Sequence, residues 1–160
     1  MTRFGMSGTL PRLAVGSLRG TTPRDVESGV SAADWSRDGA TLAVARETLP
    51  GATLEHPSGN VLARSTAYIS AVRVSPSGDR IAFVEHDIDG NSRGAVAVVD
   101  GKGRRTVLTP EYFDVNGLAW SPAGDEVWFT AATKGSPRSI RAVTPPGGSA
   151  RSTGKRATSS

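Results

Sequence analysis

Apolar and polar residues alternate with a period of two on both sides of three glycines, Gly39, Gly78 and Gly124. Before the glycines, the alternating pairs are Ala33/Trp35, Val72/Val74 and Leu118/Trp120. After them, the pairs are Leu42/Val44, Ile81/Phe83 and Val127/Phe129. Such alternation directs one face of a β-strand into a core, and a helical period of 3.6 residues fits none of the three segments. Each glycine therefore marks the turn of a predicted β-hairpin.

The three predicted turns share the pattern Ser-x-x-Gly, in which Pro76 and Pro122 follow the serine in two copies and Arg37 does so in the first. Proline presets φ at the second position of a turn, and glycine supplies the positive φ at its end. We assign these positions a structural role in the repeat, which covers Trp35, Ser36, Gly39, Val74, Ser75, Pro76, Gly78, Trp120, Ser121, Pro122 and Gly124.

A looser second half follows each hairpin and supplies two more short strands. The candidate segments are residues 53–55 with 61–62, residues 95–100 with 106–108, and residues 139–143. Residues 13–15 and 20–26 look like the back half of an earlier unit. The repeat therefore predicts about three and a half four-stranded units within residues 10–143, with pieces at 10–27, 28–66, 67–110 and 111–143.

Four-stranded units of ~40–45 residues have the size of propeller blades, so the predicted fold class is all-β, a partial β-propeller of four-stranded antiparallel blades. The strings Trp35-Ser36-Arg37-Asp38-Gly39 and Val74-Ser75-Pro76-Ser77-Gly78 resemble the blades of bacterial TolB-like, WD-repeat-like propellers. Residues 33–130 are also similar to the propeller attached C-terminally to some bacterial serine/threonine protein kinases.

The resemblance implies a non-catalytic propeller segment that serves as a protein-interaction or sensor module, with a protein or peptide as its partner. It further implies that the chain is a fragment of a bacterial serine/threonine protein kinase. The alternative is the accessory propeller of a TolB-like periplasmic protein or of a propeller-containing peptidase.

The number of units is too small for a closed propeller, which has four to eight blades. An incomplete ring leaves an open strand edge on each side, and such edges favour self-association. After Val143 the repeat stops and residues 144–160 form a basic tail. We therefore expect a truncated or frameshifted piece of a longer propeller protein. A further hypothesis is that the 160-residue product has no function of its own.

The composition disfavours or excludes several fold classes and kinds of site. The 19 glycines and 10 prolines disfavour a helix bundle, and the absence of cysteine excludes disulfides and thiolate zinc sites. Six of the 19 basic residues, and none of the 15 acidic ones, lie from Val127 onward. Such a tail can attract RNA, DNA or an anionic membrane, but its composition is typical of a disordered terminus. We therefore expect no specific nucleic-acid partner.

No segment has the length of a membrane span or the pattern of a signal peptide. The longest apolar run is residues 95–99, far shorter than the ~20 residues that cross a bilayer. Glycine, serine and proline interrupt the N-terminal residues 1–18, where a signal peptide would need an apolar run. The compartment stays open, with the cytoplasm expected by default.

Candidate catalytic chemistry is limited to two histidines, His56 and His86. Glu85, His86 and Asp87 are consecutive, so a strand would direct them to opposite faces, and a surface position near a loop is expected for His86. The chain contains no Gly-x-Ser-x-Gly elbow and no kinase His-Arg-Asp or Asp-Phe-Gly motif. We therefore predict no enzyme activity and no catalytic residues.

Metal and cofactor motifs are incomplete. Asp87-Ile88-Asp89-Gly90-Asn91 begins like a calcium loop, but its sixth position is Ser92 and its twelfth is Val98, which favours a polar hairpin loop. Gly101-Lys102-Gly103 lacks the third glycine of a dinucleotide loop, and Gly154-Lys155 lacks the upstream glycine of a phosphate loop. We predict no cofactor and no metal. Trp128 is expected to pack against a neighbouring blade, with ligand binding as the alternative.

Overall fold

The computed structural model describes residues 11–16, 19–20, 22–87 and 92–147. Within these ranges the chain forms thirteen strands and no helix, which confirms the predicted all-β class. Every strand pairs antiparallel with its neighbour in the chain within four separate sheets. Two of these sheets have four strands, one has three and one has two.

The sheets follow one another along the chain, as the repeat predicts. An N-terminal hairpin consists of β1 (Arg12–Val15) and β2 (Arg24–Ser28). Blade 1 contains β3 (Val30–Trp35), β4 (Leu42–Glu47), β5 (Ala52–Glu55) and β6 (Val61–Ser65). Blade 2 contains β7 (Ile69–Val74), β8 (Arg80–His86), β9 (Gly94–Asp100) and β10 (Arg105–Val107). Blade 3 contains β11 (Asp114–Trp120), β12 (Val127–Ala132) and β13 (Ser139–Val143).

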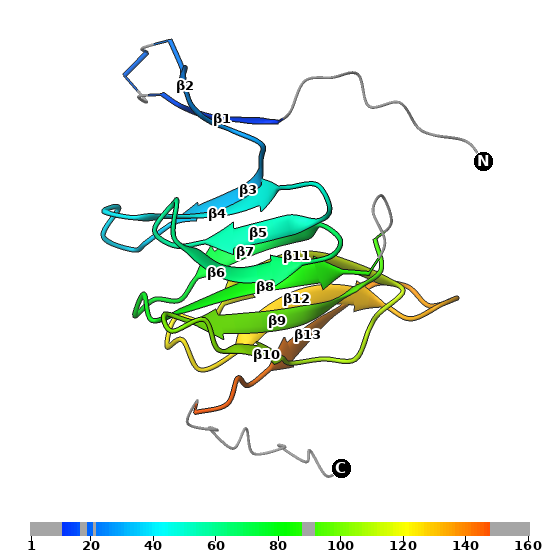
Figure 1. Ribbon diagram of the computed structural model, residues 1–160. Coiled ribbons are helices and arrows are strands. Elements are labelled where there is room, and N and C mark those ends of the chain that lie inside the picture. The colour runs from blue at the N-terminus through cyan, green and yellow to red at the C-terminus, as the bar shows by residue number, and fades with distance from the viewer. Residues whose placement is uncertain (1–10, 17–18, 21, 88–91, 148–160) are drawn as a thin grey trace, which may run out of the picture.

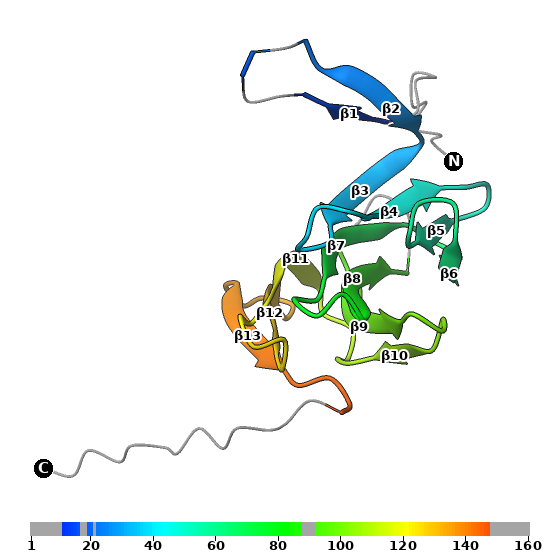
Figure 2. The same cartoon turned by 90° about the vertical axis from the view of Figure 1, so that its left-hand side faces the viewer.

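The first strand of each blade lies on the inside of the molecule. Strand β7 contacts β3 on one side and β11 on the other, and the blades fan outward from this row toward β6, β10 and β13 (Figure 1, Figure 2). The N-terminal hairpin stands beyond blade 1, at the end of the row (Figure 2).

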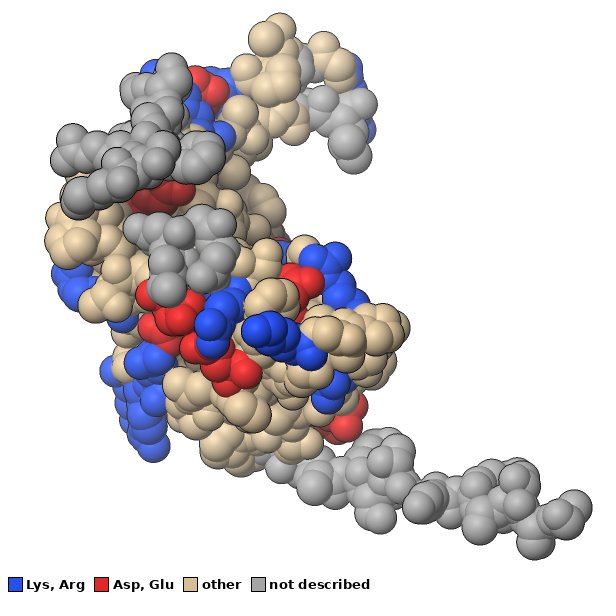
Figure 3. Space-filling model, turned by 90° about the vertical axis from the view of Figure 1, so that its right-hand side faces the viewer, with Lys and Arg blue, Asp and Glu red and all other residues tan. Residues whose placement is uncertain are grey.

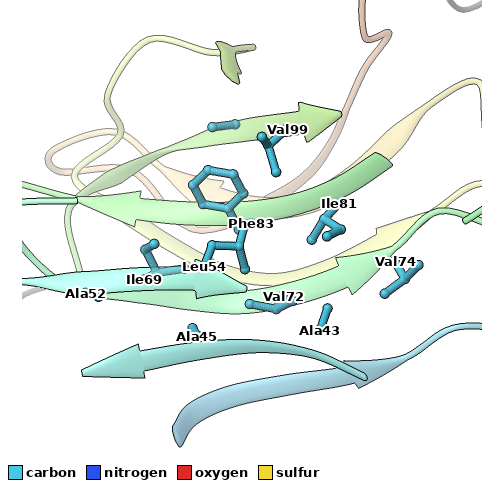
Figure 4. Close-up of a cluster of buried hydrophobic side chains, with 11 residues drawn as sticks. Ala43, Ala45, Ala52, Leu54, Ile69, Val72, Val74, Ile81, Phe83 and Val99 are labelled. Carbon is cyan, nitrogen blue, oxygen red and sulfur yellow. The ribbon is translucent and has the colours of Figure 1, made fainter. Parts of the chain in front are cut away.

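Blade 2 is buried on both faces, whereas the alternating pattern predicts one buried face for each strand. One face contributes Ile81 and Phe83 to a cluster shared with blade 1 (Figure 4). The opposite face contributes Ala82 and Val84 to a cluster shared with blade 3. A strand between two sheets has no solvent side, so its polar alternation is lost.

The three Ser-x-x-Gly turns have the same geometry. In each turn the glycine N–H donates to the serine carbonyl at 2.8–2.9 Å, and φ of the glycine is 69° to 75°. The serine hydroxyl also binds a carboxylate, which is Asp38 in blade 1, Asp79 in blade 2 and Asp125 in blade 3. The carboxylate thus comes from two residues after the serine in blade 1 and from four residues after it in the others. This shift explains why Ser77 and Ala123 are tolerated at the position that carries aspartate in blade 1.

The register of each inner strand shifts within a few residues of its end, between Val30 and Ala32, Ser70 and Arg73, and Asn116 and Leu118. In blade 2 the bulge holds Ala71 at a φ of 53°, and in blade 3 it holds Gly117 at 65°. Bulges increase the local twist of a strand. The inner strands of all three blades therefore share a register irregularity in the same region.

Candidate functional site

The predicted repeat residues come together at one end of the row of inner strands. Trp35, Val74 and Trp120 are the last residues of β3, β7 and β11, and the three Ser-x-x-Gly turns follow them directly. A hollow of about 350 Å³ opens between the turns. We call it the turn-end hollow, lined by Trp35, Arg37, Val74, Ser75, Pro76, Trp120, Ser121 and Pro122.

Equivalent positions in this hollow have different surroundings. Trp120 reaches the preceding blade, where its indole Nε1 donates to the carbonyl of Arg73 at 2.9 Å. The guanidinium of Arg80 lies 5.3 Å from the centre of its ring. Trp35, in contrast, is 51% exposed, and among the described residues its indole makes no hydrogen bond to a neighbouring blade. Two tryptophans at the same repeat position therefore differ in their contacts.

A second hollow, of about 660 Å³, lies at the opposite end of the strands, where β11 begins and β12 ends. We call it the loop-end hollow, lined by Ser92, Arg93, Phe113, Asp114, Ala132, Thr133, Gly135, Ser136 and Arg138. Phe113 is its one aromatic lining residue and is 52% exposed. A half-exposed phenyl ring beside hydroxyl and guanidinium groups offers both apolar contact and hydrogen bonds to a ligand.

Ion pairs shape the polar rim of the loop-end hollow. The guanidinium of Arg138 binds the carboxylate of Asp114, which raises the pKa of Arg138 above its ordinary value. Arg93 donates from Nε to Glu111 at 2.8 Å. The end view of the molecule shows basic and acidic side chains next to one another here (Figure 3). The rim of the hollow is therefore polar and close to charge-balanced rather than strongly basic.

Sequence reasoning missed the loop-end hollow because its residues lie outside the repeated strings. The segment from Thr133 to Arg138 connects β12 to β13 and has no similar counterpart in the other blades. The one available signal is Phe113, a large aromatic residue between Tyr112 and Asp114 just before a predicted strand.

Both histidines lie within hydrogen-bond distance of groups in their own blade. His86 is buried and stacks on Tyr68 with ring centres 3.8 Å apart, so the predicted surface position is wrong. Its Nε2 lies 2.8 Å from Oγ of Ser70, and its Nδ1 lies 2.6 Å from the carbonyl oxygen of Arg93. Burial lowers the pKa of His86. His56 lies on blade 1, 3.1 Å from Oγ1 of Thr41.

Metal and phosphate chemistry has no assembled site in the described ranges. These residues contain no group of three or more His, Asp or Glu side chains that could hold a metal ion. Residues 88–91 of the calcium-like string, Gly154-Lys155 and most of the basic tail lie outside the described residues. The Gly101–Gly103 segment is a tight turn in which Oδ1 of Asp100 accepts hydrogen bonds from the amides of Lys102 and Arg104.

Consecutive antiparallel sheets that fan from a row of inner strands define a segment of a β-propeller. Comparison with solved structures supports this assignment. The chain is similar to TolB from Acinetobacter baumannii, with a TM-score of 0.67 and 20% sequence identity. The similarity covers 86% of this chain and 36% of TolB, so the chain spans little more than a third of that protein. No family model and no curated protein matches the sequence.

Among the residues that the structure describes, no helix has the length and apolar character needed to cross a membrane.

Proposed function

We propose that this chain is a non-catalytic propeller segment that binds a protein or peptide at the loop-end hollow. The observation that carries the proposal is Phe113, half-exposed on the lining of the larger of the two hollows. Aromatic residues and arginines contribute strongly to protein interfaces, and loops on a rigid β scaffold commonly carry binding residues. Arg93 and Arg138 line the same hollow, and their ion pairs hold them in position.

A peptide selection tests the binding role directly. The purified chain is immobilised and used to select binders from a phage-displayed library of random peptides, and the affinities of the selected peptides are measured by fluorescence anisotropy. Phe113→Ala should weaken binding by about tenfold or more, as expected for removal of a central aromatic contact. Val107→Ala is the matched control, since Val107 is equally exposed but lies on β10, away from the hollow.

Equal binding by Phe113→Ala and the unaltered chain would overturn the assignment of the site. Failure to select any peptide with the folded chain would overturn the binding role itself.

The parentage of the segment is a separate proposal. The strings around Trp35, Val74 and Trp120 support an origin in a bacterial serine/threonine protein kinase, where the propeller would act as sensor or scaffold. The similarity to TolB supports the alternative, an accessory propeller of a TolB-like periplasmic protein, and a propeller-containing peptidase belongs to the same alternative. Translation of the flanking DNA in every frame distinguishes them. Upstream kinase motifs favour the first origin, whereas an upstream signal peptide or a downstream hydrolase elbow favours the second.

A further inference from the structure

The side of blade 3 that faces away from blade 2 is apolar and uncovered by any described residue. Phe129 faces blade 2, so its strand neighbours Trp128 and Thr130 face the other way. Across the β12–β13 pairing, Trp128 stands opposite Ala142 and Thr130 opposite Ile140. Trp128 is 43% exposed and Ile140 is 81% exposed. We call these four residues the outer face of blade 3.

The equivalent positions in blade 2 show what such a face does when a blade follows. Trp128 corresponds to Ala82 in the repeat, and Thr130 corresponds to Val84. Both Ala82 and Val84 are fully buried against blade 3. The outer face of blade 3 therefore has the position and the apolar character of a blade interface.

A complementary face exists at the other end of the molecule. Asp34 stands opposite Ala43, which packs against blade 2, so Trp35 faces away from blade 2. Its repeat equivalent Trp120 faces the preceding blade and donates to the carbonyl of Arg73 there. Arg73 corresponds to Ala119 in blade 3. If blade 3 of another molecule lay before blade 1, Trp35 would face the carbonyl of Ala119 as Trp120 faces that of Arg73.

The two ends also differ in their strand pairings. Blade 3 has three strands in the described residues, and the unpaired edge of β13 is where the fourth strand of blades 1 and 2 lies. The N-terminal hairpin, in contrast, is a pair of strands outside any blade. Its Val15 and Val26 are about 40% exposed. One end thus has a free edge where one outer strand is missing, and the other end presents two strands, one more than a four-stranded blade needs.

From this repetition of an established interface, we propose that two copies of the chain close into one ring, with blade 3 of each copy docked on blade 1 and the hairpin of the other. The contact joins two different surfaces of the chain. The ring closes with two copies when the rotation that relates one copy to the next is half a turn. Two copies supply six blades, within the range of four to eight that closed propellers use.

Part of the charge on the surface of blade 1 that would be covered is already paired. On that side Arg46 binds Glu27 and Glu55 in the same molecule. Charges that are already paired and hydrogen-bonded avoid most of the cost of burying an isolated ion. The Arg46 cluster is therefore compatible with burial, whereas the exposed Arg64, opposite Thr53 on the same face, would lie at the contact.

The first test is the mass of the purified chain in solution, measured by size-exclusion chromatography with light scattering. The proposal predicts about 33 kDa, twice the chain mass of 16.6 kDa. Ile140→Lys should give the monomer mass, because it places a charge in the contact. Val107→Lys, at an exposed valine on the outer strand of blade 2, should keep the dimer. A folded monomer of the unaltered chain, a dimeric Ile140→Lys or an open-ended series of larger species would each overturn the proposal.

Cross-linking distinguishes this contact from a symmetric one. The chain has no cysteine, so single cysteines can be introduced without a background. Ile140→Cys and Val26→Cys chains, mixed and treated with a short bismaleimide, should cross-link to each other, whereas Ile140→Cys alone should stay uncross-linked. Cross-linking of Ile140→Cys to itself, or none in the mixture, would overturn the arrangement. If a further blade of a longer chain covers this face instead, light scattering should give the mass of a monomer.

Discussion

The indole Nε1 of Trp120 in blade 3 donates a 2.9 Å hydrogen bond to the main-chain carbonyl of Arg73 in blade 2. The bond joins the last residue of β11 to the neighbouring inner strand β7. Arg80 of blade 2 adds its guanidinium above the same ring at 5.3 Å. One side chain thus connects two blades through a hydrogen bond, a cation–π contact and apolar packing.

Trp120→Phe should lower the free energy of unfolding by about 1–2 kcal/mol, since it removes the donor and leaves the Arg73 carbonyl without it. Urea denaturation followed by circular dichroism measures the change. Leu49→Ala is the control, with an expected change within about 0.5 kcal/mol, because Leu49 is fully exposed. Equal losses in both variants would contradict an interblade role for the Trp120 bond.

The bulge in β7 should be strained at Ala71, whose φ of 53° is unfavourable for a residue with a Cβ atom. Ala71→Gly should therefore raise the free energy of unfolding by about 0.5–1 kcal/mol. The reciprocal change, Gly117→Ala, should lower it by about 1 kcal/mol, because a Cβ there meets only Oγ1 of Thr130 at 3.9 Å and the cost is conformational. Thermal unfolding of both variants measures these two changes in stability. A shift of the same sign in both would be inconsistent with this explanation.

Ser75 should contribute more to stability than its exposed neighbour Ser77. The Ser75 hydroxyl is buried, accepts a hydrogen bond from the Arg80 amide at 3.1 Å and donates to Asp79 at 2.9 Å. Ser75→Ala should cost about 1–2 kcal/mol, since it leaves the part-buried amide of Arg80 without this acceptor. Ser77→Ala should cost less, because its hydroxyl is exposed to water. Urea midpoints compare the two, and the reverse order would refute the assigned role.

Stability should fall as the pH drops below about 6.5. Burial lowers the pKa of His86 in the folded state below its ordinary value of 6.5. The unfolded chain therefore takes up the proton first as the pH falls, and protonation favours unfolding. His86→Gln, which does not titrate, should flatten this decline. Urea denaturation between pH 8 and pH 5 measures the effect; an equally steep decline in His86→Gln would assign the pH dependence to other groups.

Most of the candidate site could not be predicted from the sequence. Ser36, Ser75 and Ser121 recur in a string, so their turns could be predicted. The loop-end hollow depends on Phe113 and Arg138, which lie 25 residues apart in segments without a repeat. Only the pairing of β11 with β12 and β13 brings the two segments to one end of the blade. A sequence pattern reports local conformation, and it carries little information on which loops meet.

Local periodicity by itself determined the strands, the turns and the division into blades, because alternation of side chains and the positive φ of Gly39, Gly78 and Gly124 are properties of short segments. Tertiary structure decided which faces are covered. Trp35 and Trp120 occupy the same repeat position, yet one is half-exposed and the other is bonded to Arg73. His86 follows a strand pattern like its neighbours, yet it is buried against Tyr68. Burial depends on whether another sheet lies alongside, and that is a property of the assembled blades rather than of the residues within one.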